Sequence, residues 1–286
     1  MGKHEIEVAK SRVRIEDGKV EVLTDPLVKR CPLRSHLYGC EEESRETVKR
    51  VLESHIKDLG MYSAERNFNL VDDPVSFGAS EMIMDAMRDG LLDAAVSVCE
   101  GVGTIVITSP ELVETVGAHM TGIVSTSPIP EVRRSLLRRG SFVLDKKCTI
   151  DQVKGFQKAV KAGYRRVAVT IVASRPQDAE RIREQAKKLR AEVLIMAVHT
   201  TGIDAEQAAQ LAGSCDVVWA CASQAVRDII GPKALMQIGT GIPVFALTRL
   251  GKLIMLNRAL SMPDQFLVQR AKLPYLDEGR QPSPLL

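Results

Sequence analysis

The chain has 286 residues, of which 45% are hydrophobic and 26% are charged, as is ordinary for a globular protein with a sizeable core. Its 39 basic and 36 acidic residues are interspersed and leave a formal net charge of +3, so no overall field draws the chain onto nucleic acid. Aromatic residues make up only 4%, which argues against a base-stacking platform. No apolar run approaches the roughly 20 residues of a membrane span, and the charged N-terminus lacks a signal-peptide core. We therefore expect a cytoplasmic protein without a nucleic-acid or membrane partner.

The first elements of the chain are predicted to be β-strands. Polar and apolar residues alternate from residue 8 to residue 23 on both sides of Asp17-Gly18, and an Asp-Gly pair between two such runs is a strong hairpin signal. Residues 30–40 are typical of an irregular loop, which carries Cys31 and Cys40. An amphipathic helix is expected to follow at 43–57.

From residue 75 onward, predicted helices and strands alternate. The helices are expected at 80–89, 110–118, 130–139, 151–162, 176–189, 204–212 and 224–229. The strands are expected at 94–98, 141–144, 166–172, 193–198, 216–220 and 243–247. Such alternation is typical of βαβ units, so the predicted fold class is α/β, with a mainly parallel sheet or sheets, flanking helices and a preceding N-terminal β-hairpin.

This pattern divides the chain into four parts. They are the hairpin with its cysteine-containing loop (1–42), a first α/β half (43–149), a second α/β half (150–262) and a C-terminal tail (263–286). The end of the tail, from residue 274, is expected to be loosely ordered. One large domain and two smaller domains both fit a chain of this length.

Ligands of parallel sheets bind beyond the carboxyl ends of the strands, so the residues that follow each strand are candidates for a site. Three strands deliver chemistry-bearing residues: Cys99 and Gly101-Val102-Gly103-Thr104 after the strand at 94–98, His199-Thr200-Thr201-Gly202 after 193–198, and Cys221 after 216–220. Thiols and imidazoles are preferred ligands of soft or borderline metals. Together with a base, a thiol also makes a nucleophilic site.

Ordinary structural roles compete with these hypotheses. Free cysteine is among the most buried residue types, so Cys99 or Cys221 can simply fill the core, and Cys148 and Cys215 are interpreted as structural. The eight residues between Cys31 and Cys40 match no standard zinc or ferredoxin spacing. The glycine-containing turns match neither a dinucleotide motif nor a P-loop, which leaves tight turns as the alternative to anion binding.

Seven short segments of the chain follow one another in a characteristic order: Arg30-Cys31-Pro32-Leu33, Lys57-Asp58-Leu59-Gly60-Met61, Val75-Ser76-Phe77-Gly78-Ala79-Ser80-Glu81, Cys99-Glu100-Gly101-Val102-Gly103-Thr104, Ser127-Pro128-Ile129-Pro130-Glu131-Val132, Ala197-Val198-His199-Thr200-Thr201-Gly202 and Ile242-Pro243-Val244-Phe245-Ala246-Leu247-Thr248. Together they resemble the methanogenesis marker protein 8 family over residues 5–255. The resemblance implies an anaerobic archaeal cytoplasm, which suits oxygen-sensitive thiolate or iron-sulfur chemistry. It also implies a role in the assembly or activation of a methanogenic enzyme, but it assigns no catalytic residue.

Three functions remain open. The first is a metal- or iron-sulfur-binding accessory protein of methanogenesis-related metabolism, whose partner is a methanogenic enzyme or its activation machinery and whose thiolate ligands are Cys31, Cys40, Cys99 and Cys221. The second is an enzyme acting on a small phosphorylated or carboxylated metabolite, with Cys99 as nucleophile and His199 as base. In that enzyme the anion would be bound by Gly101, Gly103, Thr104, Thr200, Thr201 and Gly202. The third is a non-catalytic binding or scaffolding protein, and formation of a homo-oligomer is compatible with all three.

Overall fold

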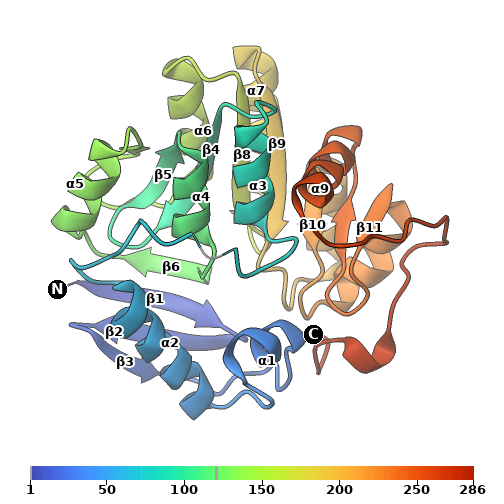
Figure 1. Ribbon diagram of the computed structural model, residues 1–286, viewed down its shortest axis with the longest axis horizontal. Helices are drawn as coiled ribbons and strands as arrows, with labels where there is room; N and C mark the ends of the chain where they lie inside the picture. The colour runs from blue at the N-terminus through green and yellow to red at the C-terminus, as the bar shows by residue number, and fades with distance from the viewer. Residues whose placement is uncertain (1, 72, 120–121) are drawn as a thin grey trace.

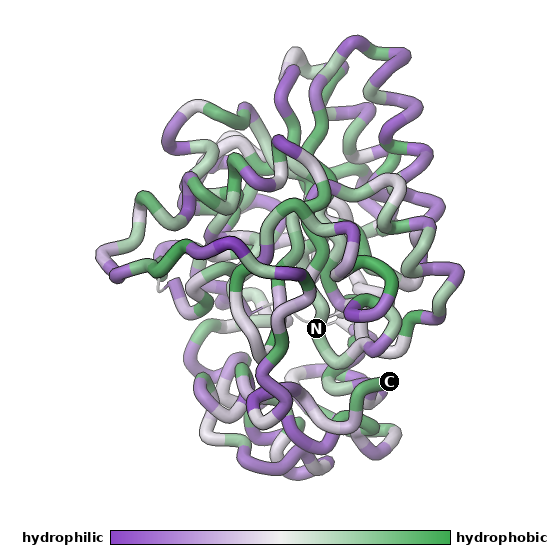
Figure 2. The backbone as a smooth tube through the Cα atoms, turned by 90° about the vertical axis from the view of Figure 1, so that its right-hand side faces the viewer, coloured by the Kyte–Doolittle hydropathy of each residue, from purple (hydrophilic) through white to green (hydrophobic). Residues whose placement is uncertain are grey.

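The computed structural model describes residues 2–71, 73–119 and 122–286. Within these residues the strands form two sheets, which Figure 1 shows one below the other: a four-stranded sheet in the order β3-β2-β1-β6 and an eight-stranded sheet in the order β11-β12-β10-β9-β8-β4-β5-β7. In Figure 2 the hydrophobic stretches concentrate in the interior and the hydrophilic ones on the outer helices. The fold is therefore of the α/β class, with flanking helices around its sheets.

The four-stranded sheet contains the predicted N-terminal hairpin. Its strands are β1 (Lys3–Val8), β2 (Ser11–Glu16), β3 (Lys19–Val22) and β6 (Gly122–Thr126), all of them antiparallel to their neighbours. The turn between β2 and β3 is formed by Asp17 and Gly18, both with positive φ, which confirms the Asp-Gly signal. Helix α2 (Arg45–Leu59) packs Val48 and Leu52 onto this sheet.

The segment between the hairpin and α2 is more regular than the sequence indicates. Helix α1 (Pro32–Tyr38) lies within the predicted loop, with Cys31 as its N-cap residue. Proline in the first helical turn has no N–H to satisfy, and Gly39 ends the helix in the left-handed conformation. These two residues are the local signal for the helix.

The eight-stranded sheet is parallel only in its centre. Its strands are β4 (Ala94–Cys99), β5 (Gly103–Ile107), β7 (Phe142–Val143), β8 (Arg166–Val172), β9 (Glu192–Val198), β10 (Val217–Trp219), β11 (Met236–Ile238) and β12 (Val244–Ala246). Strands β4, β8, β9 and β10 run parallel, whereas β5, β7, β12 and β11 join them in antiparallel pairs. The prediction of a mainly parallel sheet is therefore wrong at both edges.

The reason for this correction is visible at the end of β4. Cys99 pairs with Gly103, so β5 begins after a turn of only three residues. A parallel return needs a crossover of a dozen or more residues, and such a short turn can only make an antiparallel hairpin. Gly101 and Gly103 have φ values of +78° and +71°, which accounts for the glycines of this turn.

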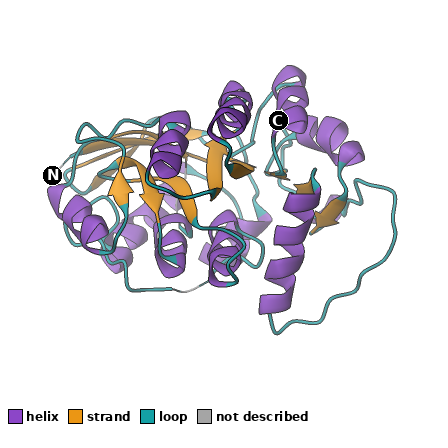
Figure 3. Cartoon of the chain, turned by 90° about the horizontal axis from the view of Figure 1, so that it is seen from above, coloured by secondary structure: helices purple, strands orange, loops and turns teal. Residues whose placement is uncertain are grey.

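Helices cover both faces of the eight-stranded sheet, as the view from above in Figure 3 shows. One face packs against α3 (Ala79–Arg88), α4 (Pro110–Gly117) and α9 (Arg249–Ser261). The other face packs against α6 (Gln152–Lys161), α7 (Gln177–Leu189) and α8 (Ala205–Ser214). The remaining elements are α5 (Pro130–Arg138) and the short turns η1 (Val226–Ile230), η2 (Gly231–Lys233) and η3 (Glu278–Arg280). Across the described residues, no helix combines the length and hydrophobicity that crossing a bilayer requires.

The end of the tail is held more firmly than the sequence indicates. After α9 a long loop runs along the outside of the molecule and returns to the sheet (Figure 3). The Gln281 side chain accepts a hydrogen bond of 2.5 Å from Arg227, and Leu286 exchanges backbone hydrogen bonds with Ala222 and Gln224. The predicted loose end is thus attached to the loop that follows β10.

Candidate functional site

The predicted site residues lie in separate places. His199, Thr200, Thr201, Gly202 and Cys221 lie at the carboxyl ends of β9 and β10. A second group, which consists of Cys99, Gly101, Gly103 and Thr104, lies at the turn between β4 and β5. Cys40 lies apart from both groups, where its sulfur accepts a hydrogen bond of 3.5 Å from Arg50.

His199 is held by residues of the N-terminal sheet. Its Nε2 lies 2.8 Å from Oε1 of Glu7, and the same oxygen lies 3.2 Å from the Lys10 ammonium. Burial raises the pKa of Glu7, but His199 and Lys10 lower it by more, so the net pKa is below its usual value. His199 also has a φ of 55°, which is rare for a residue other than glycine. The imidazole therefore joins the two sheets through a side-chain hydrogen bond.

The polar residues after His199 hold the strand-end loops together. The Thr200 hydroxyl donates to the Trp219 carbonyl over 2.7 Å, and the Thr201 hydroxyl accepts from the Ala222 amide over 3.3 Å. At Gly202 a Cβ would lie 2.9 Å from Cε of Lys10, so the glycine allows a close approach. The hydroxyls predicted to bind an anion are thus engaged within the fold.

The loop that carries Cys221 is organised by a buried arginine. Nη1 of Arg227 donates to the carbonyls of Ala220, Cys221 and Ser223, at 3.2, 2.9 and 2.8 Å. Burial lowers the pKa of Arg227 to about 10, which still leaves the guanidinium charged at neutral pH. The arginine fixes the turn in which Cys221 has a φ of 38°.

Cys99 lies in the core beneath the β4–β5 turn. It is fully buried, and its sulfur donates to Oε2 of Glu100 over 3.2 Å. Burial, with the Glu100 charge beside it, raises the pKa of the Cys99 thiol well above its usual value. Glu100 in turn forms a buried ion pair of 2.7 Å with Arg66. A protonated thiol without solvent access is poorly suited to the nucleophilic role predicted for it.

The turn residues support neighbouring segments. The Gly101 amide donates to the Thr126 hydroxyl, and the Gly101 carbonyl accepts from the Ile129 amide and the Cys148 thiol. At Gly103 a Cβ would lie 2.3 Å from the Cys148 carbonyl oxygen. The buried Thr104 hydroxyl donates to Gln152 and accepts from the Asp151 amide at the start of α6. The turn therefore positions the segments on either side of it.

The four predicted thiolate ligands do not meet at one point. Cys99 lies at the β4–β5 turn, Cys40 beside Arg50, and Cys31 on the side of the molecule that carries Cys221. In the described part of the chain, no three His, Cys, Asp or Glu side chains are grouped so that they could hold a metal ion. The donor set thus offers no single cluster site in this arrangement, and the iron-sulfur cluster stays a prediction.

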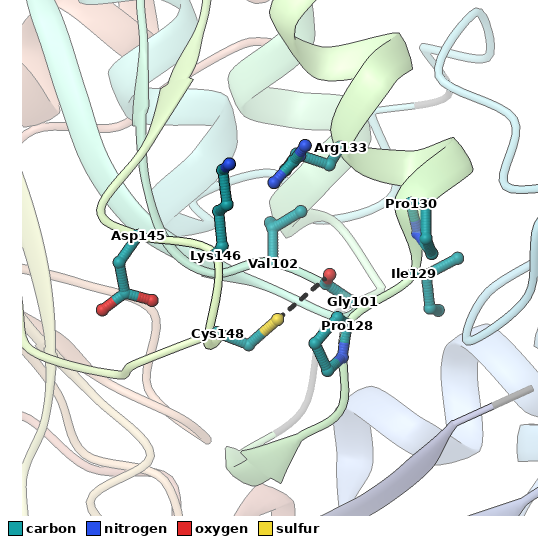
Figure 4. A pocket seen from close by; sticks show the side chains of 9 residues that line it. All are labelled: Gly101, Val102, Pro128, Ile129, Pro130, Arg133, Asp145, Lys146 and Cys148. Carbon is teal, nitrogen blue, oxygen red and sulfur yellow. Dashed lines mark hydrogen bonds between the residues drawn. The ribbon is translucent and has the colours of Figure 1, made fainter.

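A small pocket opens beside the β4–β5 turn. It has a volume of about 100 Å³, and it is lined by Gly101, Val102, Pro128, Ile129, Pro130, Arg133, Asp145, Lys146 and Cys148. Figure 4 shows that its walls come from the β4–β5 turn, the start of α5 and the segment after β7. Helix α5 begins here without a side-chain cap, so its first amides add positive potential on this side.

Two cationic side chains line the pocket, and neither has an ionic partner among the described residues. The Nε atom of Arg133 is buried and makes no hydrogen bond within them. In the view of Figure 4, Lys146 extends toward the Arg133 guanidinium, whereas the Asp145 carboxyl points away from both. Asp145 accepts hydrogen bonds from the Lys147 and Thr149 amides, at 2.8 and 3.3 Å. The one acidic side chain of the lining thus accepts hydrogen bonds from its own loop, and the two cations give the pocket an excess of positive charge.

Cys148 adds a thiol to the pocket wall. Burial raises its pKa to about 11, with a further increase from Asp145 and a decrease from Arg133. At pH 7 only about one in 10⁴ of these thiols is ionised. The sulfur donates to the Gly101 carbonyl over 3.2 Å. Cys148 therefore acts as a neutral wall of the pocket.

Comparison with known proteins places the chain in a family. Residues 4–260 match the model of a family described as "Uncharacterized protein conserved in archaea (DUF2099)". The chain belongs to this archaeal family. A member from Methanocaldococcus jannaschii, named "Uncharacterized protein MJ0054", is 37% identical to it over 288 residues and covers both chains completely. That similarity includes the C-terminal residues beyond the family model.

The sequence predicts one lining residue of the pocket, and it does not predict the two cationic side chains that line it. Gly101 was a predicted anion-binding residue and does line the pocket. Arg133 belongs to a run of arginines that is typical of a solvated helix end, and the sequence around Cys148 indicates a structural role for its thiol. A usable signal was the Pro-initiated helix at 130, with Arg133 on its first turn. This signal predicts a pocket only if residues 145–148 are known to fold against that turn.

Proposed function

We propose that this member of the archaeal family binds a small carboxylated or phosphorylated metabolite in the pocket beside α5. The observation that carries the proposal is the buried Nε of Arg133, which has no hydrogen-bond partner in the described residues and lines the same pocket as the exposed cation Lys146. Burying a donor without a partner is costly, and an anion removes that cost by accepting charge-assisted hydrogen bonds. The arginine fork suits the planar oxygens of a carboxylate or a phosphate.

The size of the pocket limits the ligand class. A cavity volume of about 10–15 Å³ is enough to admit one water molecule, so a pocket of about 100 Å³ admits several. Sites for cofactors and drug-sized ligands range from about 300 to 1,000 Å³. The pocket therefore suits an anion of the size of phosphate or acetate, or the anionic end of a longer metabolite.

The chemistry of the lining supports binding more than catalysis. A nucleophilic cysteine needs a low pKa or an adjacent base, whereas the pKa of Cys148 is raised to about 11. The base predicted from the sequence, His199, is paired with Glu7. We therefore propose a binding role, and any reaction would have to involve a group that the ligand itself brings.

The test is a calorimetric titration with inorganic phosphate and with acetate at constant ionic strength. Arg133→Gln should abolish saturable binding, and Lys146→Gln should weaken it by about tenfold, because each charge-assisted hydrogen bond contributes about 1.5–3 kcal/mol. The matched control is Arg134→Gln, since Arg134 is the next residue, is exposed and pairs with Glu131 at 2.6 Å. Equal binding by all four proteins, or no binding by any of them, would contradict the proposal.

The methanogenesis link stays a prediction alongside this proposal. An archaeal family and a Methanocaldococcus relative are compatible with it. The resemblance to methanogenesis marker protein 8, the methanogenic partner and the iron-sulfur cluster all await their own tests. Metal analysis of protein purified without oxygen, beside a Cys31→Ala variant, would decide the last of these.

A further inference from the structure

Helix α9 carries large apolar side chains on two opposite faces. On one face Ile254 and Met255 are fully buried and pack into the core on one side of the large sheet. On the opposite face Leu253, Leu256 and Leu260 are 47%, 38% and 87% exposed. A helix that is apolar on all sides is normally covered on all sides. The outer face of α9 is therefore a candidate surface for a further partner.

The exposed leucines form one continuous stripe along the helix. Their spacing of three and then four residues is that of a single helix face, and at 3.6 residues per turn they lie within an arc of about 60°. The exposed Arg249, four residues before Leu253, continues the stripe to the start of α9. We call these four residues the α9 stripe: Arg249, Leu253, Leu256 and Leu260. Figure 1 shows α9 at the outside of the molecule, on the side of β10 and β11.

The exposed charges at the two ends of α9 oppose the dipole of their own helix. Arg249 lies in a first turn that has no acidic residue, although the N-terminus of a helix disfavours a cation. Asp264 is exposed just beyond the other end, where an acidic side chain is disfavoured. Neither side chain has an ionic partner among the described residues, and Arg258 in the last turn is already paired with Asp73 and Asp85. A second helix that runs the opposite way would make both charges favourable.

We propose that the α9 stripe is the interface of a twofold-symmetric dimer of this chain, in which the two α9 helices pack antiparallel. In such a dimer, if one residue of the first copy contacts another of the second, the reverse contact also forms. An axis that passes between residues 256 and 257 brings Leu253 onto Leu260 of the other copy. The same axis brings Arg249 opposite Asp264 of the other copy, because both pairs of positions are centred on that point. Each arginine then meets an acidic side chain and the negative end of the other helix.

The charge pattern favours a second copy over other occupants of this surface. A parallel pair of α9 helices would place like charges together at both ends, which is unfavourable. A uniformly anionic surface would attract Arg249 but repel Asp264. A different protein would not require the apolar and the charged positions to share one centre, whereas a twofold axis does. The dimer is independent of the anion pocket beside α5, since neither uses a residue of the other.

Sedimentation equilibrium across the micromolar range tests the dimer. We expect a particle of twice the chain mass of 31.4 kDa, which dissociates on dilution because two helices of about 20 Å give an interface at the small end of the range for stable dimers. Leu256→Glu should be a monomer at every concentration, since it places two carboxylates beside the axis. Leu27→Glu is the matched control, because Leu27 is also exposed and lies outside α9, and it should still dimerise. A monomeric unmodified chain, or a dimer that survives Leu256→Glu, would overturn the proposal.

An exchange of charges tests the antiparallel register. Arg249→Glu and Asp264→Arg should each weaken dimerisation by about tenfold or more, because symmetry repeats every like-charge contact twice. The double variant Arg249→Glu/Asp264→Arg restores opposite charges at both contacts, and its dimer affinity should return to within about threefold of the original. A misfolded helix could not produce that recovery, so this result does not depend on how Leu256→Glu folds. A double variant as weak as either single one would show that the two positions do not face each other and would overturn the proposal.

Discussion

The ends of β9 and β10 carry more chemistry-bearing side chains than the pocket beside α5, but their polar groups are already paired. His199 is bound to Glu7, Thr200 to the Trp219 carbonyl, and Arg227 to a set of carbonyl oxygens. In the pocket, by contrast, Arg133 and Lys146 have no ionic partner among the described residues.

This difference separates two uses of the same residue types. Buried polar groups of folded proteins are nearly always hydrogen-bonded, so a buried donor without a partner calls for an explanation. An absent ligand that accepts its hydrogen bond is one explanation. Paired groups hold segments together, and their removal should lower stability. Removal of an unpaired group from a binding site should lower the affinity for the ligand and have little effect on stability.

Arg66→Met should destabilise the protein by about 3–5 kcal/mol, because it leaves the Glu100 carboxylate buried without a counter-charge. Denaturation by urea measures the change. Arg133→Gln should change stability by less than about 0.5 kcal/mol in the same assay, as expected for a side chain without a partner to lose. The double variant Arg66→Met/Glu100→Leu is the control, and it should recover much of the loss. A loss as large for Arg133→Gln as for Arg66→Met would show that Arg133 stabilises the fold as a paired side chain does.

Arg227→Met should cost about 3 kcal/mol, since several buried carbonyls lose a charged donor at once. Anion affinity at the pocket should stay unchanged, because the two regions share no side chain. Arg190→Met provides the control, as an exposed arginine at the end of α7. Calorimetry and urea denaturation on the same samples separate the two effects. Weaker anion binding in Arg227→Met would mean that the regions are coupled.

Gly103→Ala should cost about 2 kcal/mol and abolish anion binding. The new Cβ would lie 2.3 Å from the Cys148 carbonyl oxygen, and the backbone at this position has a φ of +71°. Gly90→Ala is the matched control, because its φ is +69° and no atom lies within 4 Å of the added Cβ. It should carry only the strain of the left-handed conformation, about 1 kcal/mol. If Gly103→Ala keeps its anion affinity, the β4–β5 turn does not contribute to the binding site.

Glu7→Gln should have the smallest effect, under about 1 kcal/mol, because the side chains of Glu7 and His199 are each about a quarter exposed and water weakens their contact. The pKa of Glu7 is lowered in the folded protein, so its contribution is present above the ordinary pKa of glutamate. That contribution should disappear as the pH falls below about 4.5. Urea denaturation across this range should therefore show the two proteins converging in acid. A difference that grows on acidification would reverse the sign and contradict the assignment.

Most local elements of the fold follow from the sequence, but the helices α1 and α9 and the edge strands of the large sheet do not. The Asp17-Gly18 hairpin and the alternation of helices and strands follow from residue type and periodicity. The direction of β5 depends on the turn at Gly101 and Gly103, whose glycines favour a tight turn over an anion cradle without predicting that a strand follows. A count of the residues between the two apolar runs would have favoured the hairpin.

The candidate site was predictable only in part, because it is assembled from distant segments. Gly101 was found from its place after a strand, but Arg133 and Lys146 approach each other only when residues 145–148 fold over the β4–β5 turn. The same limit explains why Cys40 and Cys99, predicted to be ligands of one metal site, lie apart. Their shared residue type does not indicate where the loop of each one packs. Packing between segments that are distant in the sequence determines both the composition of the pocket and the separation of the two cysteines.

If the missing partner of Arg133 is a ligand, proton–nitrogen NMR of the arginine Nε–H groups will detect its binding at this side chain. Phosphate or acetate is added at constant pH and ionic strength while the Arg133 Nε–H and Gly101 amide signals are followed. We expect both signals to shift together and to saturate, while those of Arg66 and Arg134 stay in place. Shifts that increase without saturation, or that are equal for Arg133 and Arg134, would contradict it.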